Sequence, residues 1–403
     1  MKIAWFVPSL LIATQSYAGG WEASPLDTAF MYKDGSYGEV SVASLDYAVK
    51  ATALRNPGGV APATFSEKNI VKNQSRPNFS VKSSFSNFSL GLSSFNSAAM
   101  KLNGSGPSFA FGANLATTAN GSAIPSADAE IDTLALIGKY NLTENFDILL
   151  GANQNSLQKS TATTSRGTYN ISSKSGTSEI YGFAYSIPDI AFRLELIAQP
   201  RTKLTASTTY DPSAYGGYTI ATALAGGESD CPAATSTASD GTGTYATVNF
   251  NSTLHRPETY TLNFQSGIAE DTLLIGSIHK TNWSKAQIDV PTGCSASSTG
   301  SKFTDTTTTK IGIGRKLTDN WSILASFQQE TGGKKSSESL FTVNNGYQSL
   351  NLGASYKMDN ITISAGYSYT DIGDVSIDIG GTNYATYKNN TASALGLKIG
   401  VSF

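Results

Sequence analysis

Few side chains in this sequence are of the types that act as catalytic bases or metal ligands. Histidine occurs only twice, as His255 and His279, and neither has an acidic partner or a nucleophilic serine motif at a recognisable spacing. The acidic residues are scattered singly through predicted turns, so no carboxylate pair or cluster of metal ligands is formed. We therefore expect no enzymatic activity, no bound metal and no cofactor.

The two cysteines offer a different chemistry. Cys231 and Cys294 both fall in long polar segments, and the C-x-x-C spacing of redox and zinc motifs is absent. In an oxidising compartment the two thiols could form a disulfide between adjacent loops. Two free, exposed thiols are the alternative.

Basic side chains on predicted strands are the remaining candidates for binding. Arg193 and Arg201 are eight residues apart, which on one strand places them on the same face as Glu195 and Gln199. Apolar residues occupy the opposite face, so this face is predicted to point inward. Lys280 is assigned to an inward face together with the small residue Gly276 and the polar Asn282. These cations could bind an acidic ligand; alternatively, Arg193 and Glu195 pair with each other in a polar interior.

Composition narrows the class of protein that must position these residues. Only 14% of the 403 residues are charged, against about 25% in an ordinary soluble domain. The net charge of -2 provides no basic surface for nucleic acid. After residue 18, no apolar run approaches the roughly 20 residues that a membrane-spanning helix needs. With 38 glycines, 19 tyrosines and 18 phenylalanines, the composition is typical of a large all-β protein.

The two ends of the chain indicate where it functions. Lys2, the apolar residues 3–12 and Ser16-Tyr17-Ala18 form the pattern of a cleavable signal peptide over residues 1–18, rather than a buried helix. Residues 395–403 alternate strictly between apolar and small or polar side chains and end on Phe403. This segment resembles the closing strand of bacterial outer-membrane barrels. We expect an exported chain in the outer membrane of a Gram-negative bacterium.

Alternation of this kind recurs in segments about ten residues long. Residues 350–356 and 361–369 flank Asp359-Asn360 and predict a hairpin with a two-residue turn. Further segments with the pattern are 260–264, 273–283 and 321–327. In 273–283, His279 shares a face with Leu273, Ile275 and Trp283, which is predicted to contact lipid or the aromatic interface. Short turns alternate with long Ser-, Thr- and Gly-rich loops, so the sequence predicts a transmembrane antiparallel β-barrel of a dozen or more strands.

Residues 19–75 precede the first clear strand and carry only weak helical stretches, of which 47–54 is the best. Such a segment is either a periplasmic extension or a plug that fills the lumen. A barrel of this size would otherwise leave an open aqueous channel. The expected organisation is a signal peptide over 1–18, a plug or hatch over 19–75 and a barrel over 76–403.

Within this N-terminal segment, Asn56-Pro57-Gly58 resembles the Asn-Pro-Ala-Gly motif in the hatch of FadL-type long-chain fatty-acid transporters, with Gly58 where that family usually has alanine. Segments 256–260, 282–284 and 318–321 are similar to strand boundaries of the same family. The resemblance implies a monomeric barrel of about 14 strands with an N-terminal hatch, surrounded by outer-membrane lipid and lipopolysaccharide. It further implies passive import of long-chain fatty acids or other hydrophobic small molecules through a lateral opening in the wall.

Two other functions stay open on the sequence alone. A general or substrate-selective porin would have an open lumen, and an adhesin would use its long loops to bind a partner. The state of residues 19–75 discriminates among them, because only the transporter needs a plugged lumen. A lateral exit also needs an interrupted strand ladder, for which Ser105-Gly106-Pro107 is one candidate and a simple loop is the alternative.

Overall fold

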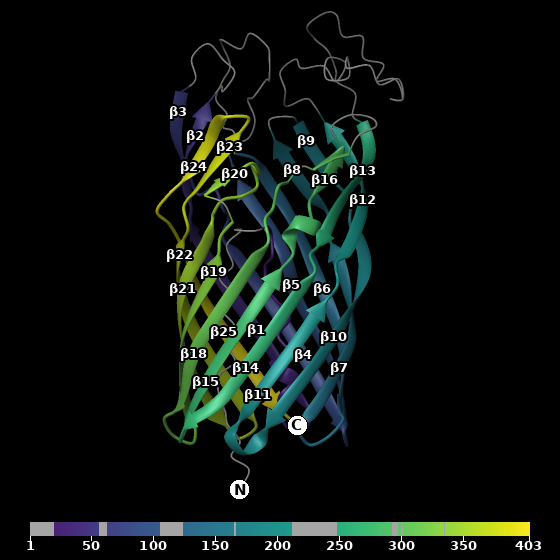
Figure 1. The fold of residues 1–403 in the computed structure, drawn as a ribbon, viewed down its shortest axis with the longest axis vertical. Coiled ribbons are helices and arrows are strands. Elements are labelled where there is room, and N and C mark those ends of the chain that lie inside the picture. The colour runs from purple at the N-terminus through teal and green to yellow at the C-terminus, as the bar shows by residue number, and fades with distance from the viewer. Residues whose placement is uncertain are drawn as a thin grey trace, which may run out of the picture.

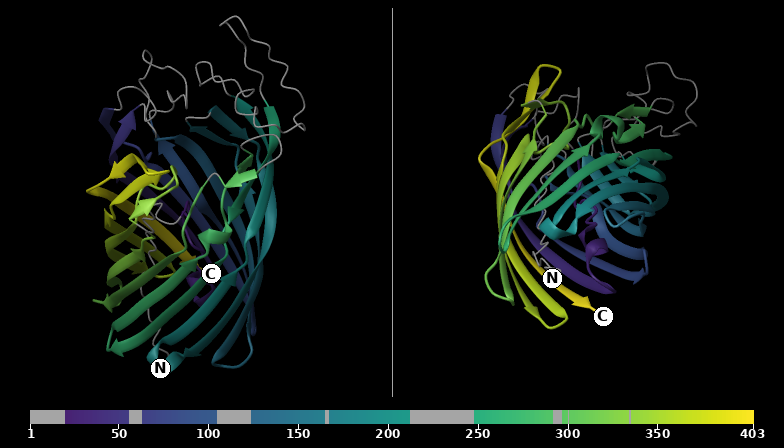
Figure 2. Two further views of the ribbon diagram at one scale, coloured as in Figure 1. Left: turned by 45° about the horizontal axis from the view of Figure 1, so that its top comes forward. Right: turned by 60° about the horizontal axis from the view of Figure 1, so that its bottom comes forward.

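The computed structural model describes residues 20–55, 63–104, 124–164, 167–211, 248–291, 297–299, 301–333 and 335–403. Fourteen of the described strands form a closed antiparallel ring, which is the wall of the barrel in Figure 1 and Figure 2. In order around the ring they are β1 (Tyr37–Ala48), β4 (Gln74–Phe85), β5 (Phe88–Asn103), β6 (Ser126–Asn141), β7 (Phe146–Leu157), β10 (Lys174–Ile187), β11 (Phe192–Gln199), β14 (Thr259–Ala269), β15 (Thr272–Thr281), β18 (Thr306–Lys316), β19 (Trp321–Thr331), β21 (Gly346–Met358), β22 (Ile361–Ile372) and β25 (Asn390–Ser402).

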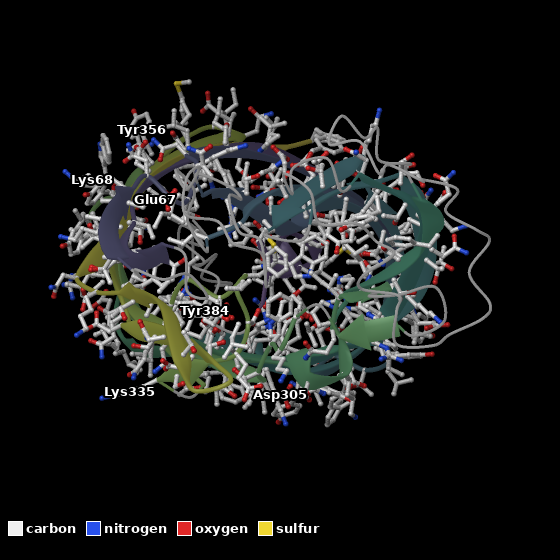
Figure 3. The ribbon with its side chains drawn as sticks, turned by 90° about the horizontal axis from the view of Figure 1, so that it is seen from above. Glu67, Lys68, Asp305, Lys335, Tyr356 and Tyr384 are labelled. Carbon is white, nitrogen blue, oxygen red and sulfur yellow. The ribbon has the colours of Figure 1, made fainter. Side chains whose placement is uncertain are left out.

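The period-2 pattern of the sequence decides which side chains face out of this ring. Every wall strand exposes at least one large apolar side chain. The predicted hairpin of residues 350–369 is formed by β21 and β22 and places Leu350, Leu352 and Tyr367 outward as expected. Together these residues form an apolar belt around the barrel, which is what a wall in contact with lipid requires. Seen along the barrel in Figure 3, Tyr356 lies outside the ring, whereas side chains crowd its interior.

The two ends of the barrel differ. At one end, which we call the turn end, short turns join the strands and the C-terminus lies there (Figure 1). At the other, the loop end, β8 (Ser160–Thr164), β9 (Gly167–Ile171), β12 (Thr202–Asp211), β13 (Val248–Arg256), β16 (Asp289–Pro291) and β17 (Ser297–Thr299) extend the wall. A second sheet also stands there, made of β20 (Ser336–Ser337), β23 (Val375–Ile379), β24 (Thr382–Tyr387), β2 (Lys50–Arg55) and β3 (Ala63–Lys68).

Helices in the described residues are limited to the short 3-10 segments η1 (Ala29–Tyr32), η2 (Pro188–Ile190) and η4 (Trp283–Lys285). None of them is long and apolar enough for a membrane crossing.

The expected plug boundary at residue 75 is wrong. Residues 37–48 form the wall strand β1, which pairs with β25 on one side and β4 on the other, and residues 50–68 form the β2–β3 hairpin at the loop end. The inward face of β1 carries acidic, small and aromatic residues. On the outward face only Val40 and Val42 are large and apolar, so the alternation along this strand is weak. The described plug is therefore residues 20–36, which we call the N-terminal plug. The predicted signal peptide, residues 1–18, lies outside the described residues.

Candidate functional site

The N-terminal plug occupies the lumen through close packing of η1 against the wall. Phe30 and Met31 are almost completely buried and join an apolar cluster with side chains of β5, β6, β7, β10 and β11. A Cβ atom at Gly91 of β5 would lie 2.2 Å from the Met31 sulfur and 2.8 Å from the Phe30 ring. Only glycine leaves room for this helix, so the wall is shaped to hold the plug.

A buried carboxylate fixes the same helix by hydrogen bonds. Thr28 and Tyr32 of the plug donate to Glu195 of β11 over 2.7 Å and 2.8 Å, and Asn263 of β14 donates to it over 2.9 Å. The guanidinium of Arg193 lies 3.9 Å from the centre of the Tyr32 ring, a cation–π contact. Arg193 and Glu195 thus face inward as predicted, and both hold the plug. Burial and the Glu195 charge raise the pKa of Tyr32, so its hydroxyl stays a proton donor.

Glu22 anchors the start of the plug to β15. Its carboxylate lies 2.9 Å from Nε2 of His279 and accepts a hydrogen bond from Thr281 over 2.8 Å. Burial alone would raise the pKa of Glu22, but His279 and Thr281 outweigh it and the pKa is lowered. The prediction that His279 faces lipid is therefore wrong, because it is buried in the lumen and also bonded to Thr261.

Lys280 is the next residue on β15 after His279, so it lies on the opposite, outer face and is exposed. The prediction that it faces the lumen is wrong. Gly276, taken as an inward residue because it is small, also faces outward. A Cβ atom there would lie 2.1 Å from the Phe264 ring, so the aromatic side chain covers the glycine on the lipid side. Arg201 is exposed as well, because Pro200 and Arg201 interrupt the strand between β11 and β12. Of the three predicted ligand residues, only Arg193 points into the lumen.

The ladder between β4 and β5 is incomplete. The two strands pair only from Phe79 and Ser94 toward the turn end, so residues 74–78 of β4 and 95–103 of β5 have no partner in each other. A β-bulge lies at Ser97, between Asn96 and Ala98, where β5 pairs with β6. Residues 70–72 pair with residues 101–103 of β5, so the opening in the strand pairing of the wall lies over residues 95–100.

The N-terminal plug covers this opening from the lumen. Ala23 N–H donates to the Ser97 carbonyl over 3.0 Å and Ala99 N–H donates to the Trp21 carbonyl over 2.8 Å, so residues 21–23 take the place of β4 beside β5. Arg76 of β4 donates to the Ala23 carbonyl over 2.7 Å. Closure of the opening therefore depends on the plug's position.

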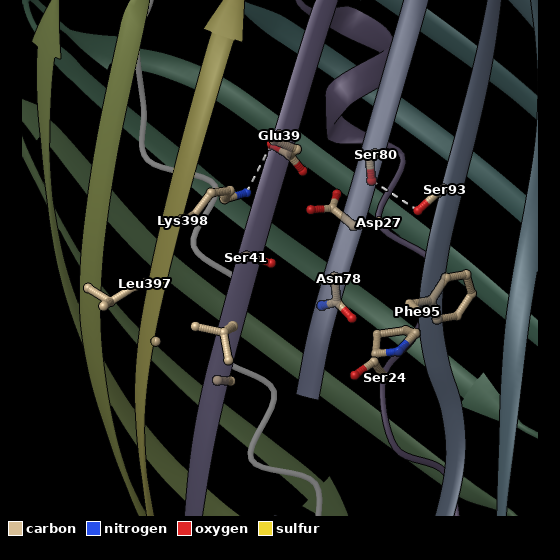
Figure 4. A pocket seen from close by; sticks show the side chains of 14 residues that line it. Ser24, Asp27, Glu39, Ser41, Asn78, Ser80, Ser93, Phe95, Leu397 and Lys398 are labelled. Atoms are coloured by element: carbon tan, nitrogen blue, oxygen red, sulfur yellow. Dashed lines mark hydrogen bonds and ion pairs between the residues drawn. The ribbon is translucent and has the colours of Figure 1, made fainter. Parts of the chain in front are cut away.

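A pocket adjoins the opening on its turn-end side (Figure 4). Ser24 of the plug, Asn78 of β4 and Phe95 of β5 line it, together with an ion pair in which Lys398 lies 3.4 Å from Glu39. Burial, with the nearby Lys398 charge, lowers the pKa of Lys33 in the plug to about 8. The lumen on this side is thus polar and charged.

The loop-end half of the lumen has the opposite character. A continuous cluster of buried apolar side chains packs inside it, with members on both sides of the β4–β5 opening; they include Trp21, Leu45, Tyr47, Ala98, Met100, Leu102, Ile131, Leu157, Ile171, Leu204, Leu254 and Trp283. Farther toward the loop end, Tyr169, Tyr210 and Phe250 contact one another with ring centres 4.9–6.5 Å apart. By their strand register these three rings, which we call the aromatic collar, share the inward face with Leu204 and Ile171. Buried apolar side chains therefore extend from the level of the collar to the opening.

Comparison with solved structures places this architecture. A FadL homologue from Pseudomonas aeruginosa superimposes with a TM-score of 0.69 at 14% identity, covering 93% of this chain and 92% of that chain. The chain has the FadL-type fold. The FadL-type fold is also found in two toluene transporters: TodX of Pseudomonas putida (TM-score 0.58, 10% identity, 95% of each chain) and TbuX of Ralstonia pickettii (0.57, 11%, 93% of this chain and 90% of that one). No protein-family model matches the sequence, and no curated protein sequence matches it.

Several predicted features of this FadL-type barrel lie outside the described residues: Asn56, Pro57 and Gly58, the cysteines Cys231 and Cys294, and the segment 105–107. Sequence reasoning missed the residues that seat the plug, Trp21, Glu22 and Tyr32. The only indication of them in the sequence is the presence of aromatic and acidic residues in residues 20–36, and this does not predict which wall residues they contact.

Proposed function

We propose that the protein is an outer-membrane channel for passive uptake of hydrophobic compounds, with long-chain fatty acids as the first substrate class. The observation that carries this proposal is the buried apolar cluster inside the barrel between the aromatic collar and the β4–β5 opening. A porin for polar solutes gains nothing from such a cluster in its lumen. For an alkyl chain each buried CH₂ contributes about 0.8 kcal/mol, so a chain of many methylenes is drawn strongly from water.

The route is argued from the contrast between the two halves of the lumen. The turn-end half holds the plug and charged side chains such as Lys33, Lys398 and Glu39, which disfavour an apolar solute. The opening between β4 and β5 leads instead toward the apolar belt and the lipid. We propose that displacement of residues 21–23 from β5 opens this path and that the solute leaves sideways, without an energy source.

Uptake assays test the function. Cells that lack their own transporter would express this chain and receive labelled oleate, labelled toluene or a labelled small sugar. We expect oleate to enter faster than in empty-vector cells. Uptake of toluene alone would move the substrate class to monoaromatic hydrocarbons, and uptake of the sugar alone would refute the proposal.

Two neighbouring residues provide a matched pair of variants for the lining. Leu204 of β12 is fully buried in the apolar cluster, whereas Thr205 faces outward. Leu204→Asp places a charge in the passage and should lower oleate uptake about tenfold or more. Thr205→Asp adds the same charge outside and should leave uptake unchanged. Equal uptake in both variants, at equal amounts of folded barrel, would argue against the lumen as the path.

A reversible disulfide cross-link between the plug and β5 tests the lateral route. Glu22 and Ala98 form an antiparallel bridge of the non-hydrogen-bonded type, in which Cα atoms lie about 4.5 Å apart, a separation that suits a disulfide. In a background with Cys231 and Cys294 replaced by serine, Glu22→Cys with Ala98→Cys should block uptake when oxidised and restore it on reduction. The Glu22→Cys single variant controls for loss of the His279 contact. Unchanged uptake in the oxidised, fully cross-linked protein would refute the lateral route.

A further inference from the structure

A group of cations lies on the outer wall at one place on the edge of the apolar belt. Arg201, Lys203, Lys280 and Lys285 are all exposed, and they come from the β11–β12 junction, β12, the end of β15 and η4. We call these four residues the cation patch. Arg201 donates a hydrogen bond to the backbone carbonyl of Lys285, which joins the first and last of these elements across the end of β14.

The patch begins where the apolar belt ends. On β15 the outward residue Ile278 is followed at the next outward position by Lys280. On β14 the outward Tyr260 lies directly opposite Lys280 and is the last outward residue before the strand ends. On β11 the outward Leu194 and Leu196 lead to Arg201. Charges at this level of a membrane barrel meet lipid headgroups, with the aromatic Tyr260 at the interface.

The charge pattern elsewhere on the described wall is different at this level. On five other wall strands, β1, β18, β19, β21 and β22, the first outward residues beyond the belt are uncharged or acidic: Ser44, Thr309, Gln329, Gln348 and Asp371. On β5, Lys101 is neutralised by Asp128 at 2.6 Å and Glu130 at 2.8 Å. Among the described residues, none of the four patch cations forms an ion pair with a carboxylate.

The acids near the patch are largely engaged with neutral donors. Glu258 accepts hydrogen bonds from Tyr260 over 2.9 Å and Asn282 over 2.6 Å, and Asp305 accepts one from the Ser284 N–H over 2.7 Å. Asp289, near His255, is the third acid. Four cations therefore face three acids, and the patch keeps a net positive charge. Its ammonium groups, and the guanidinium N–H groups of Arg201 that do not bond Lys285, can bind oxygen anions.

We infer that the cation patch binds the phosphates of a phosphorylated glycolipid of the outer leaflet, with the acyl chains lying against the apolar belt below it. Phosphate oxygens match the donors, and the belt accommodates the chains, so a single amphiphile satisfies both surfaces. The inference rests on the proposed location in the outer membrane, but not on the transported compound. It gives Arg201 and Lys280 a lipid ligand on the outer wall instead of a substrate in the lumen.

Lipid binding to purified barrel, stripped of lipid in detergent, tests this by native mass spectrometry. The probes are diphosphoryl lipid A, monophosphoryl lipid A and phosphatidylglycerol. We expect the diphosphoryl form to bind most tightly and its binding to weaken with added salt. The triple variant Arg201→Gln, Lys203→Gln, Lys280→Gln should lower its affinity at least about tenfold, since each cation near an anionic surface contributes to binding.

A second triple variant serves as the control, with Lys68, Lys72 and Lys388 changed to Gln; these cations are exposed at the loop end and belong to segments that do not pair with β11, β12 or β15. It should bind diphosphoryl lipid A like the unmodified protein. Equal losses in the two triple variants, or equal binding of phosphatidylglycerol and diphosphoryl lipid A, would overturn the inference. Both triple variants should import oleate like the unmodified protein. The proposed function is tested separately, because it is refuted if the unmodified protein fails to import oleate, whatever the lipid-binding result.

Discussion

Replacing Tyr32 with Phe tests whether a single hydrogen bond holds the plug. The change removes the hydroxyl that donates to Glu195 over 2.8 Å but keeps the ring beneath Arg193. A hydrogen bond to a charged group contributes about 1.5–3 kcal/mol, and Glu195 is only 1% exposed, so water cannot replace the lost donor. At about 1.4 kcal/mol per factor of ten, local opening of the plug should increase between about 10- and 150-fold.

Hydrogen exchange read by mass spectrometry on peptides that cover residues 20–36 measures this opening directly. Tyr37→Phe is the matched control, because Tyr37 donates to Glu39 over 3.0 Å but belongs to the wall strand β1. Removal of the Tyr37 hydroxyl should leave hydrogen exchange in the plug unchanged. If Tyr32→Phe exchanges like the unmodified protein, or if both variants accelerate exchange equally, Glu195 does not anchor the plug.

Three further changes address the plug. The pKa of Lys33 is lowered from 10.5 to about 8 in the docked state, so docking should strengthen from pH 8 to 10.5 by at most about 3 kcal/mol, and Lys33→Met should abolish that pH dependence in exchange measurements. Gly91→Ala collides with Met31 and should cost about 1–3 kcal/mol of plug docking, seen as faster exchange over residues 28–32. The lowered pKa of Glu22 predicts that its contact with His279 is lost as pH falls below about 4.5. In Glu22→Gln, hydrogen exchange of the plug, corrected for intrinsic rates, should be fast already at about pH 7 and should not change with pH.

The lipid-facing side of the barrel was predictable because it is a local property of the sequence. In the hairpin that carries Leu350 and Tyr367, alternation and a two-residue turn together determine both faces. On β15 the same reasoning chose the wrong face for His279 and Lys280. Small residues are expected in the lumen, but Gly276 faces lipid because Phe264 lies over it, and that contact is between strands rather than within one.

The position of the plug and the opening between β4 and β5 could not be predicted from local sequence patterns, for a similar reason. The partners of Tyr32 and Glu22 are 163 and 257 residues away, so no spacing in the sequence connects them. The expected boundary at residue 75 failed because β1 presents few apolar residues to lipid. Arg201 left the predicted inward face because two residues between β11 and β12 break the strand, and a period-2 argument holds only within an unbroken strand.

The pairing of β1 with β25 has a consequence for biogenesis. Twelve register pairs join residues 37–48 to residues 391–402, so the first wall strand closes on the last and the ring is sealed only when both ends of the chain are present. The plug precedes β1 in the chain and lies inside the sealed ring. We therefore expect it to be enclosed while the sheet is still an open, curved ribbon. Its contacts with β5 and β11, which are four positions apart in the ring, would then bring these strands together. Closure over such a sequence separation is intrinsically slow, and a prefolded plug would shorten the search.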